Sequence, residues 1–197
     1  MPGSREINAQ FGNDVTIHND VAVVASMDNQ NTAESGKLFV FRKSGSSWDR
    51  TSEFRPFGGG YFRCYKNQLA LSENGLVAQA WDGRGKTVFY EDVDGEFVGR
   101  QVFNSHANTS VKAISGSIAV ESGSGQVRVY ELEDGIWSIA QTFTGTGVVL
   151  SDAFGDSIDI DGDLIIVGAQ EDDDLGNDAG AAYVFKRQQD GQFSQIR

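Results

Sequence analysis

Acidic side chains are concentrated in residues 170–180, which hold one glutamate and four aspartates. A hard cation such as Ca²⁺ binds about six to eight oxygen atoms, several of them from carboxylates on a tight turn. The stretch offers such oxygen ligands, beside its backbone carbonyls, in Asp172, Asp174, Asn177 and Asp178. A solvated acidic loop without an ion accounts for the same residues, so calcium binding and simple solvation are both open interpretations.

A second polar stretch, residues 26–37, adds further carboxylates far away in the sequence. If the two ends of the chain meet, we expect an acidic patch that includes Asp28, Glu34, Glu171 and Asp173 and binds a protein partner. Long loops on a rigid scaffold are frequent binding sites. The formal net charge of −12 and the pI near 4.5 argue against nucleic acid and anionic lipid as partners.

Aromatic side chains offer a different kind of binding surface. Residues 55–65 form a glycine-rich insertion that contains Tyr61 and Phe62, and Trp81 follows a later apolar run. With Trp48, these rings can stack on a sugar, which makes carbohydrate binding the alternative function. The competing interpretation is that the insertion is a hydrophobic flap and that Trp48 and Trp137 pack between neighbouring strand units.

The residues for catalysis are poorly placed. His18 lies in a predicted turn and His106 in a predicted link, and the sequence puts no serine or cysteine nucleophile beside either. Cys64 has no identifiable base, and two histidines are too few for a transition-metal cluster. Residues 58–60 lack the lysine and the helix of a phosphate loop. We therefore expect no enzymatic activity and no cofactor beyond the Ca²⁺ considered above.

Short strands carry or flank these residues. Apolar runs recur between turns such as Asp94-Gly95 and Asp134-Gly135, which are strong hairpin signals. Four units repeat one order of strands, at spacings of roughly 40 to 56 residues, as four-stranded propeller blades require. The sequence predicts an all-β chain, a single-domain β-propeller of four four-stranded antiparallel blades at residues 11–54, 66–103, 109–143 and 154–197.

The last unit contains a set of short motifs in a fixed order. They are Phe154-Gly155-Asp156-Ser157, Asp161-Gly162-Asp163, Val167-Gly168-Ala169 and Gly180-Ala181-Ala182-Tyr183-Val184-Phe185. This pattern resembles the FG-GAP repeat of integrin-α-like β-propellers, with Gln170 where the family has a proline. The first unit is similar through Phe11-Gly12 and residues 37–41, whereas the middle units match by strand order alone.

The resemblance implies a binding or scaffold module for protein interaction or cell adhesion, in an extracellular or secretory-lumenal compartment. It also implies calcium loops of the pattern Asp-x-Asp-x-Asp-Gly in the turn between the first two strands of a blade. Residues 159–163 depart from that pattern because strand residues interrupt them, and the turn Asp161-Gly162-Asp163 is expected to be only a turn.

Ring closure leaves three possibilities open: a closed four-bladed ring, part of a longer array, or two copies that complete one ring as a homo-oligomer. The single cysteine excludes an internal disulfide. No apolar run reaches the roughly 18 to 20 residues needed to span a bilayer, and the first residues lack the apolar core of a signal peptide. We therefore expect no membrane insertion.

Overall fold

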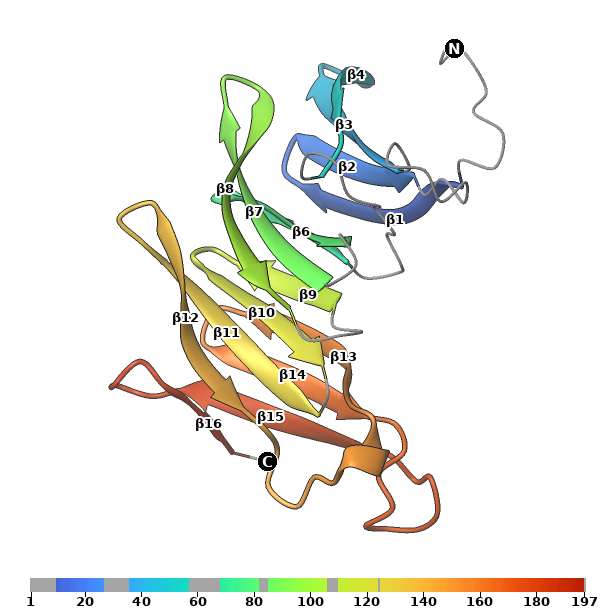
Figure 1. Ribbon diagram of the computed structural model, residues 1–197, viewed down its shortest axis with the longest axis vertical. Coiled ribbons are helices and arrows are strands. Elements are labelled where there is room, and N and C mark those ends of the chain that lie inside the picture. The colour runs from blue at the N-terminus through green and yellow to red at the C-terminus, as the bar shows by residue number, and fades with distance from the viewer. Residues whose placement is uncertain are drawn as a thin grey trace. The chain divides into compact units, whose positions relative to one another are not determined.

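Every sheet in the structure is a four-stranded antiparallel meander, which confirms the predicted fold class (Figure 1). The computed structural model describes residues 10–26, 36–56, 68–81, 85–105, 110–123 and 125–196, with the backbone alone for residues 81 and 110–112. Among these residues the sole helix is a short 3₁₀ turn, η1 (Leu150–Asp152). No helix in this described part has the length and apolar character that crossing a bilayer requires.

The four sheets, which we call blades 1 to 4, follow one another along the chain. Blade 1 consists of β1 (Phe11–His18), β2 (Val21–Ser26), β3 (Lys37–Ser44) and β4 (Ser47–Phe54). Blade 2 consists of β5 (Leu69–Ser72), β6 (Gly75–Trp81), β7 (Gly85–Val93) and β8 (Glu96–Asn104). Blade 3 consists of β9 (Ser110–Ser115), β10 (Ile118–Gly123), β11 (Gln126–Glu133) and β12 (Ile136–Phe143). Blade 4 consists of β13 (Phe154–Asp161), β14 (Leu164–Ala169), β15 (Ala181–Arg187) and β16 (Phe193–Gln195).

The backbone angles of the turn residues define the geometry of the hairpins. Asp94 and Gly95 both have positive φ, as do Asp134 and Gly135, which is the type I′ geometry expected of Asp-Gly between paired strands. The Phe11-Gly12 pair belongs to the motif pattern of the first unit. In the structure that pair lies inside β1, where the register with β2 shifts between Phe11 and Asp14, so the pair marks a β-bulge.

The chain divides into two compact units, residues 1–105 and 106–197. Unit 1 contains blades 1 and 2, and unit 2 contains blades 3 and 4. The single-domain organisation of all four blades stays a prediction.

Each blade has two faces, because side chains alternate along a strand. We call face A the side that carries the first, third and fifth residues of the second strand of a blade, and face B the opposite side. In unit 1, face A of blade 1 packs on face B of blade 2, and the shared core includes Val23, Ala25, Leu38, Val40, Leu76, Ala78, Val88 and Tyr90. In unit 2, face A of blade 3 packs on face B of blade 4, and the shared core includes Ile118, Val120, Val127, Val129, Ile165, Val167, Tyr183 and Phe185. Both units therefore use one rule of packing, face A on face B.

Candidate functional site

The acidic stretch of residues 170–180 joins β14 to β15 in blade 4 and is held from inside by one aspartate. Asp172 is only 3% exposed. Its Oδ2 accepts a hydrogen bond from the Tyr183 hydroxyl at 2.7 Å, and its Oδ1 accepts one from the Asp174 N–H at 3.1 Å. Its backbone carbonyl accepts from the Gly180 N–H at 2.9 Å. Asp172 is therefore the internal anchor of the loop, because it ties both ends of the loop to β15.

The hydrogen bond to Asp172 makes the Tyr183 hydroxyl less acidic. The hydrogen bond to Asp172, followed by burial and by the negative charges of Asp172, Asp174 and Asp152, raises the pKa of Tyr183 to about 12. A phenol that donates to a carboxylate loses its proton less readily, since the resulting phenolate would face that carboxylate. Tyr183 is therefore a hydrogen-bond donor at neutral pH and not a base.

A neighbouring segment braces the loop from the other side. Asp152 in η1 is buried, and its Oδ2 accepts a hydrogen bond from the Val149 N–H at 2.8 Å. Its backbone carbonyl accepts from the Glu171 N–H at 3.2 Å. The link before blade 4 and the acidic loop therefore form one connected structure within unit 2.

The remaining loop residues face solvent. The Asp178 N–H donates to Asp173 Oδ1 at 2.6 Å, and the Asn177 amide donates to Asp178 Oδ2 at 2.9 Å. Leu175 is 93% exposed, and Glu171 is exposed as well. The loop thus presents carboxylates and one apolar side chain on an internally bonded frame.

The predicted calcium ligands do not form an evident metal centre. Within the described residues, no three aspartate, glutamate, histidine or cysteine side chains converge as ligands of one ion would. Asp172 already accepts two hydrogen bonds through its carboxylate, while Asp174, Asn177 and Asp178 lie on the exposed part of the loop. Calcium binding stays a prediction.

Several other predicted site residues lie outside the described part of the chain. These are Asp28, Glu34, Tyr61 and Phe62, and of Trp81 only the backbone, in β6, is described. The shared acidic rim and the aromatic insertion therefore stay predictions. The two tryptophans expected between blades differ, since Trp137 is buried and Trp48 is 40% exposed.

A buried polar chain in blade 3 was not anticipated. Glu121 is almost fully buried, and its Oε2 accepts a hydrogen bond from the Tyr130 hydroxyl at 2.5 Å. Arg128 Nη1 donates to the same hydroxyl at 3.2 Å. Burial, and then the charge of Glu121, raise the pKa of Tyr130. A glutamate that follows three apolar residues in a predicted strand was the available signal, but the alternation of the strand did not show that its carboxylate is buried.

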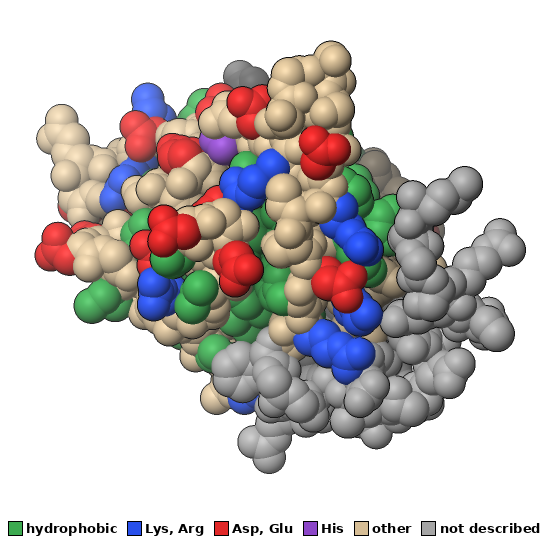
Figure 2. Space-filling view, turned by 90° about the horizontal axis from the view of Figure 1, so that it is seen from above, with side chains coloured by type: hydrophobic (Ala, Val, Ile, Leu, Met, Phe, Trp, Pro, Cys, Tyr) green, Lys and Arg blue, Asp and Glu red, His purple; other side chains and the backbone are tan. Residues whose placement is uncertain are grey.

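Charged side chains of both signs are distributed over the face of the molecule in Figure 2, with hydrophobic side chains visible between them. No single-sign field stands out there. The candidate site is accordingly the internally braced loop, and not the general surface charge.

Comparison with known proteins agrees with this architecture. Residues 137–185 match the model of the FG-GAP repeat, so the match runs from β12 through β15 and includes the candidate loop. Among curated proteins, none matches the sequence.

Solved structures show the same kind of fold at low sequence identity. A candidate 6-phosphogluconolactonase from Bacteroides fragilis is 11% identical, with a TM-score of 0.50 over 94% of this chain and 70% of that protein. A second one from Bacteroides uniformis is 11% identical, with a TM-score of 0.53 over 94% and 71%. A protein of unknown function from Desulfotomaculum acetoxidans is 13% identical, with a TM-score of 0.52 over 95% and 69%. The chain thus has a fold of the β-propeller type, and its residues 137–185 match the FG-GAP repeat that the motifs resemble.

Proposed function

We propose that this propeller module is a non-enzymatic binding protein that holds a protein partner through the acidic loop of residues 170–180. The observation that carries the proposal is the internal bracing of the loop by Asp172. The buried anchor uses one carboxylate for structure and leaves Glu171, Asp174 and Leu175 on the outside.

Bracing matters because a binding loop that is already ordered loses little conformational freedom when its partner arrives. Exposed carboxylates attract a basic partner and raise the association rate, and salt weakens that attraction. Leu175, which is exposed and follows Asp174 in the chain, adds an apolar contact. The partner that fits this chemistry is a protein segment with lysine or arginine residues beside an apolar side chain.

A peptide array provides the test. Fifteen-residue peptides rich in Lys, Arg and Leu are probed with the chain and with a Glu171→Lys/Asp174→Lys variant. The matched control is Glu96→Lys/Glu133→Lys, which makes the same charge change at exposed positions outside the loop. We expect binding by the chain and the control, and loss of binding by the loop variant. Equal binding by both variants would refute the loop as the binding surface.

Calcium assistance and an adhesive, extracellular role are the finer parts of the proposal. They are supported by the FG-GAP repeat and by the oxygen-rich loop. Thermal unfolding in EDTA and in millimolar Ca²⁺ tests them, since a cation that binds only the folded chain must raise the midpoint. The variant to compare is Asp174→Asn. Asp172 is left unchanged, because loss of this buried residue would destabilise the loop with or without an ion. An unchanged midpoint would remove calcium from the proposal.

The non-enzymatic assignment is itself a proposal. It is supported by the roles of the two buried aspartates of unit 2, since Asp152 and Asp172 both accept hydrogen bonds that hold loops in place. Turnover of 6-phosphogluconolactone by the purified chain would overturn it.

Carbohydrate binding is the second candidate, and the exposed ring of Trp48 favours it. A glycan array separates the two functions. Binding that is lost in Trp48→Ala and kept in Glu171→Lys/Asp174→Lys would support the sugar-binding alternative, and no glycan binding would exclude it.

A further inference from the structure

The contact between neighbouring blades is built in the same way in both units. The tips of the first hairpins touch, through His18 and Glu73 at 3.5 Å in unit 1. At the equivalent positions in unit 2, the Gly162 N–H donates to Ser115 Oγ at 3.1 Å. The first hairpin serves as a common reference in all four blades. Residues at the same distance from it along the strands are called equivalent.

Aromatic and ionic contacts repeat at equivalent positions as well. Phe54 on face A of blade 1 meets Tyr90 on face B of blade 2, with ring centroids 5.2 Å apart. The equivalent pair in unit 2 is formed by Phe143 and Phe185, at 4.3 Å. An ion pair closes each contact at its outer end, Arg42–Asp92 at 2.5 Å in unit 1 and Glu131–Arg187 at 2.7 Å in unit 2.

Face B of blade 1 carries the same aromatic cluster that is buried in blade 4. In blade 4, the ring of Phe154 lies 5.4 Å from Tyr183 and 6.3 Å from Phe185, edge-on to both. In blade 1, the ring of Phe11 lies 5.3 Å and 6.4 Å from the equivalent rings, Phe39 and Phe41, again edge-on. Phe154 is 3% exposed and Phe11 is 59% exposed.

Two further side chains on β1 extend this exposed surface. Val15 and Ile17 are 62% and 63% exposed, and they occupy the positions of Ile158 and Ile160. Ile160 belongs to the core of unit 2, and the partly buried Ile158 packs against that core. Face B of blade 1 is thus a blade-contact surface that no blade covers among the described residues of unit 1.

Face A of blade 4 has the opposite half of such a contact. Leu164 and Ile166 occupy the positions of Ile118 and Val120, which cover blade 4 from face A of blade 3. Both of these blade 4 side chains are about half exposed. An apolar face A and an apolar face B are therefore both left open.

We propose that face A of blade 4 docks on face B of blade 1 of a second copy of the chain. The occupant is argued from the rule that both units follow, because each observed blade contact joins a face A to a face B. Each unit by itself leaves one of the two surfaces without a covering blade, and a second copy of the chain carries the complementary half of each. A contact between unlike surfaces is heterologous and joins copies head to tail.

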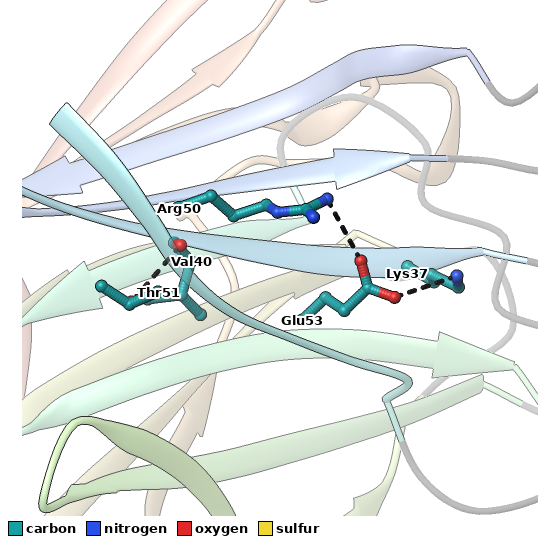
Figure 3. Close-up of polar contacts among 5 residues, drawn as sticks. All are labelled: Lys37, Val40, Arg50, Thr51 and Glu53. Carbon is teal, nitrogen blue, oxygen red and sulfur yellow. Dashed lines mark hydrogen bonds and ion pairs between the residues drawn. The ribbon is translucent and has the colours of Figure 1, made fainter. Parts of the chain in front are cut away.

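Blade 1 also has polar side chains beside its aromatic cluster, as in interfaces between proteins that can separate. The Glu53 carboxylate lies between Lys37 Nζ at 3.1 Å and Arg50 Nη1 at 3.4 Å (Figure 3). The Arg50 guanidinium stands 5.8 Å from the centroid of the Phe39 ring. Interfaces of separable proteins combine an apolar centre with a polar rim of this kind.

The proposed contact brings together one favourable pair of polar side chains and one unfavourable pair. At the hairpin tips, Asp161 of one copy would meet Asn19 of the other, an acceptor beside a donor. At the outer end, where both units have an ion pair, Lys186 would meet Lys43. Like charges there make the association weak, and salt should strengthen it by screening the repulsion.

The first experiment measures the mass of the full chain by light scattering across a range of concentrations. We expect a rise above 21.3 kDa as concentration increases. Ile17→Asp and Ile166→Asp should each weaken association by about tenfold or more, because each buries a charge in an apolar contact. The control Ile136→Asp alters an equally exposed isoleucine outside both faces and should leave association unchanged.

Mixing the two variants gives the decisive result. Ile17→Asp retains its face A and Ile166→Asp retains its face B, so the mixture should form a one-to-one pair that neither variant forms alone. A chain that stays at 21.3 kDa, or association that survives in both variants, would overturn the proposal.

A gain of affinity provides a test that does not depend on disruption. Lys43→Glu should create the missing ion pair with Lys186 and tighten association about two- to fivefold. No gain would contradict the predicted alignment. Salt also separates this proposal from the acidic loop, because salt should strengthen the contact between copies and weaken the binding of a basic peptide.

Discussion

Blades 1 and 4 contain the same three-ring cluster in two different environments. The cluster of Phe154, Tyr183 and Phe185 is covered by blade 3 and buried, while Phe11 in the equivalent cluster is largely exposed. The ring geometries nevertheless agree closely. A blade therefore arranges its own rings through strand pairing, and the neighbouring blade contributes burial and not geometry.

The largest expected difference between the two clusters is the cost of removing the first ring. Phe154→Ala should lower the free energy of unfolding by about 3–5 kcal/mol, since it leaves a cavity in a packed core. Phe11→Ala should cost only about 0.5–1.5 kcal/mol, the value of its ring contacts. Urea unfolding of both variants measures the difference. Equal costs would mean that face B of blade 1 is covered in solution as fully as that of blade 4.

The adjoining glycines sharpen the same comparison. Gly12 and Gly155 both have positive φ, but a Cβ on Gly155 would lie 2.7 Å from Ser122 Cβ, whereas a Cβ on Gly12 would meet nothing within 4 Å. Gly155→Ala should therefore cost roughly 2–4 kcal/mol and Gly12→Ala about 1–2 kcal/mol. A Ser122→Gly background should relieve part of the Gly155→Ala cost in urea unfolding. Without such relief, close approach between blades 3 and 4 is not the cause.

Tyr183→Phe converts one ring of blade 4 into its blade 1 counterpart, Phe39. We expect a loss of about 1–3 kcal/mol, because the buried carboxylate of Asp172 loses its hydroxyl donor. The pKa of Tyr183 is raised from 10.0 to about 12 in the folded chain, so its contribution to stability is complete below pH 10 and disappears as the pH rises toward about 12. Thermal unfolding between these pH values should show that decline in the wild-type chain and a smaller one in the variant. An identical decline in both would rule out Tyr183 as its source.

The smallest expected effect concerns the ion pairs at the outer end of each blade contact. Unit 1 has the cation on its first blade, as Arg42, and unit 2 has the anion there, as Glu131. Glu131→Arg and Arg187→Glu should each cost about 0.3–1 kcal/mol, and the double swap should restore most of that loss. A double-mutant cycle measured by urea unfolding tests this. Additive losses in the double variant would show that the two side chains do not act as a pair.

Much of the architecture could be predicted from local patterns. Alternating apolar residues, Asp-Gly turns and a four-unit spacing indicated four antiparallel blades, and the motifs of the last unit indicated an FG-GAP repeat, which the comparison confirms. The place of the Phe-Gly pair within β1 could not be predicted, because a bulge is defined by the register of two strands and not by one of them.

The candidate site was only partly accessible to the same reasoning. Asp172 and Asp173 are adjacent and chemically identical, yet one is buried against Tyr183 and the other is exposed. Glu121 followed an apolar run and gave no sign that its carboxylate is buried beside Tyr130. The number of charged residues follows from the composition. The group that a charged side chain contacts depends on which strand lies opposite it.

The sequence alone determined the strands, their turns, the strong negative charge and the repeated aromatic positions, because each of these depends on residues close together in the chain. Tertiary structure alone decided which aspartate anchors the loop and which of two equivalent aromatic clusters is buried. A side chain is buried only when another surface packs against it, and the local sequence does not specify that surface. Two stretches with the same local pattern therefore differ in stability and availability when only one of them has a neighbour.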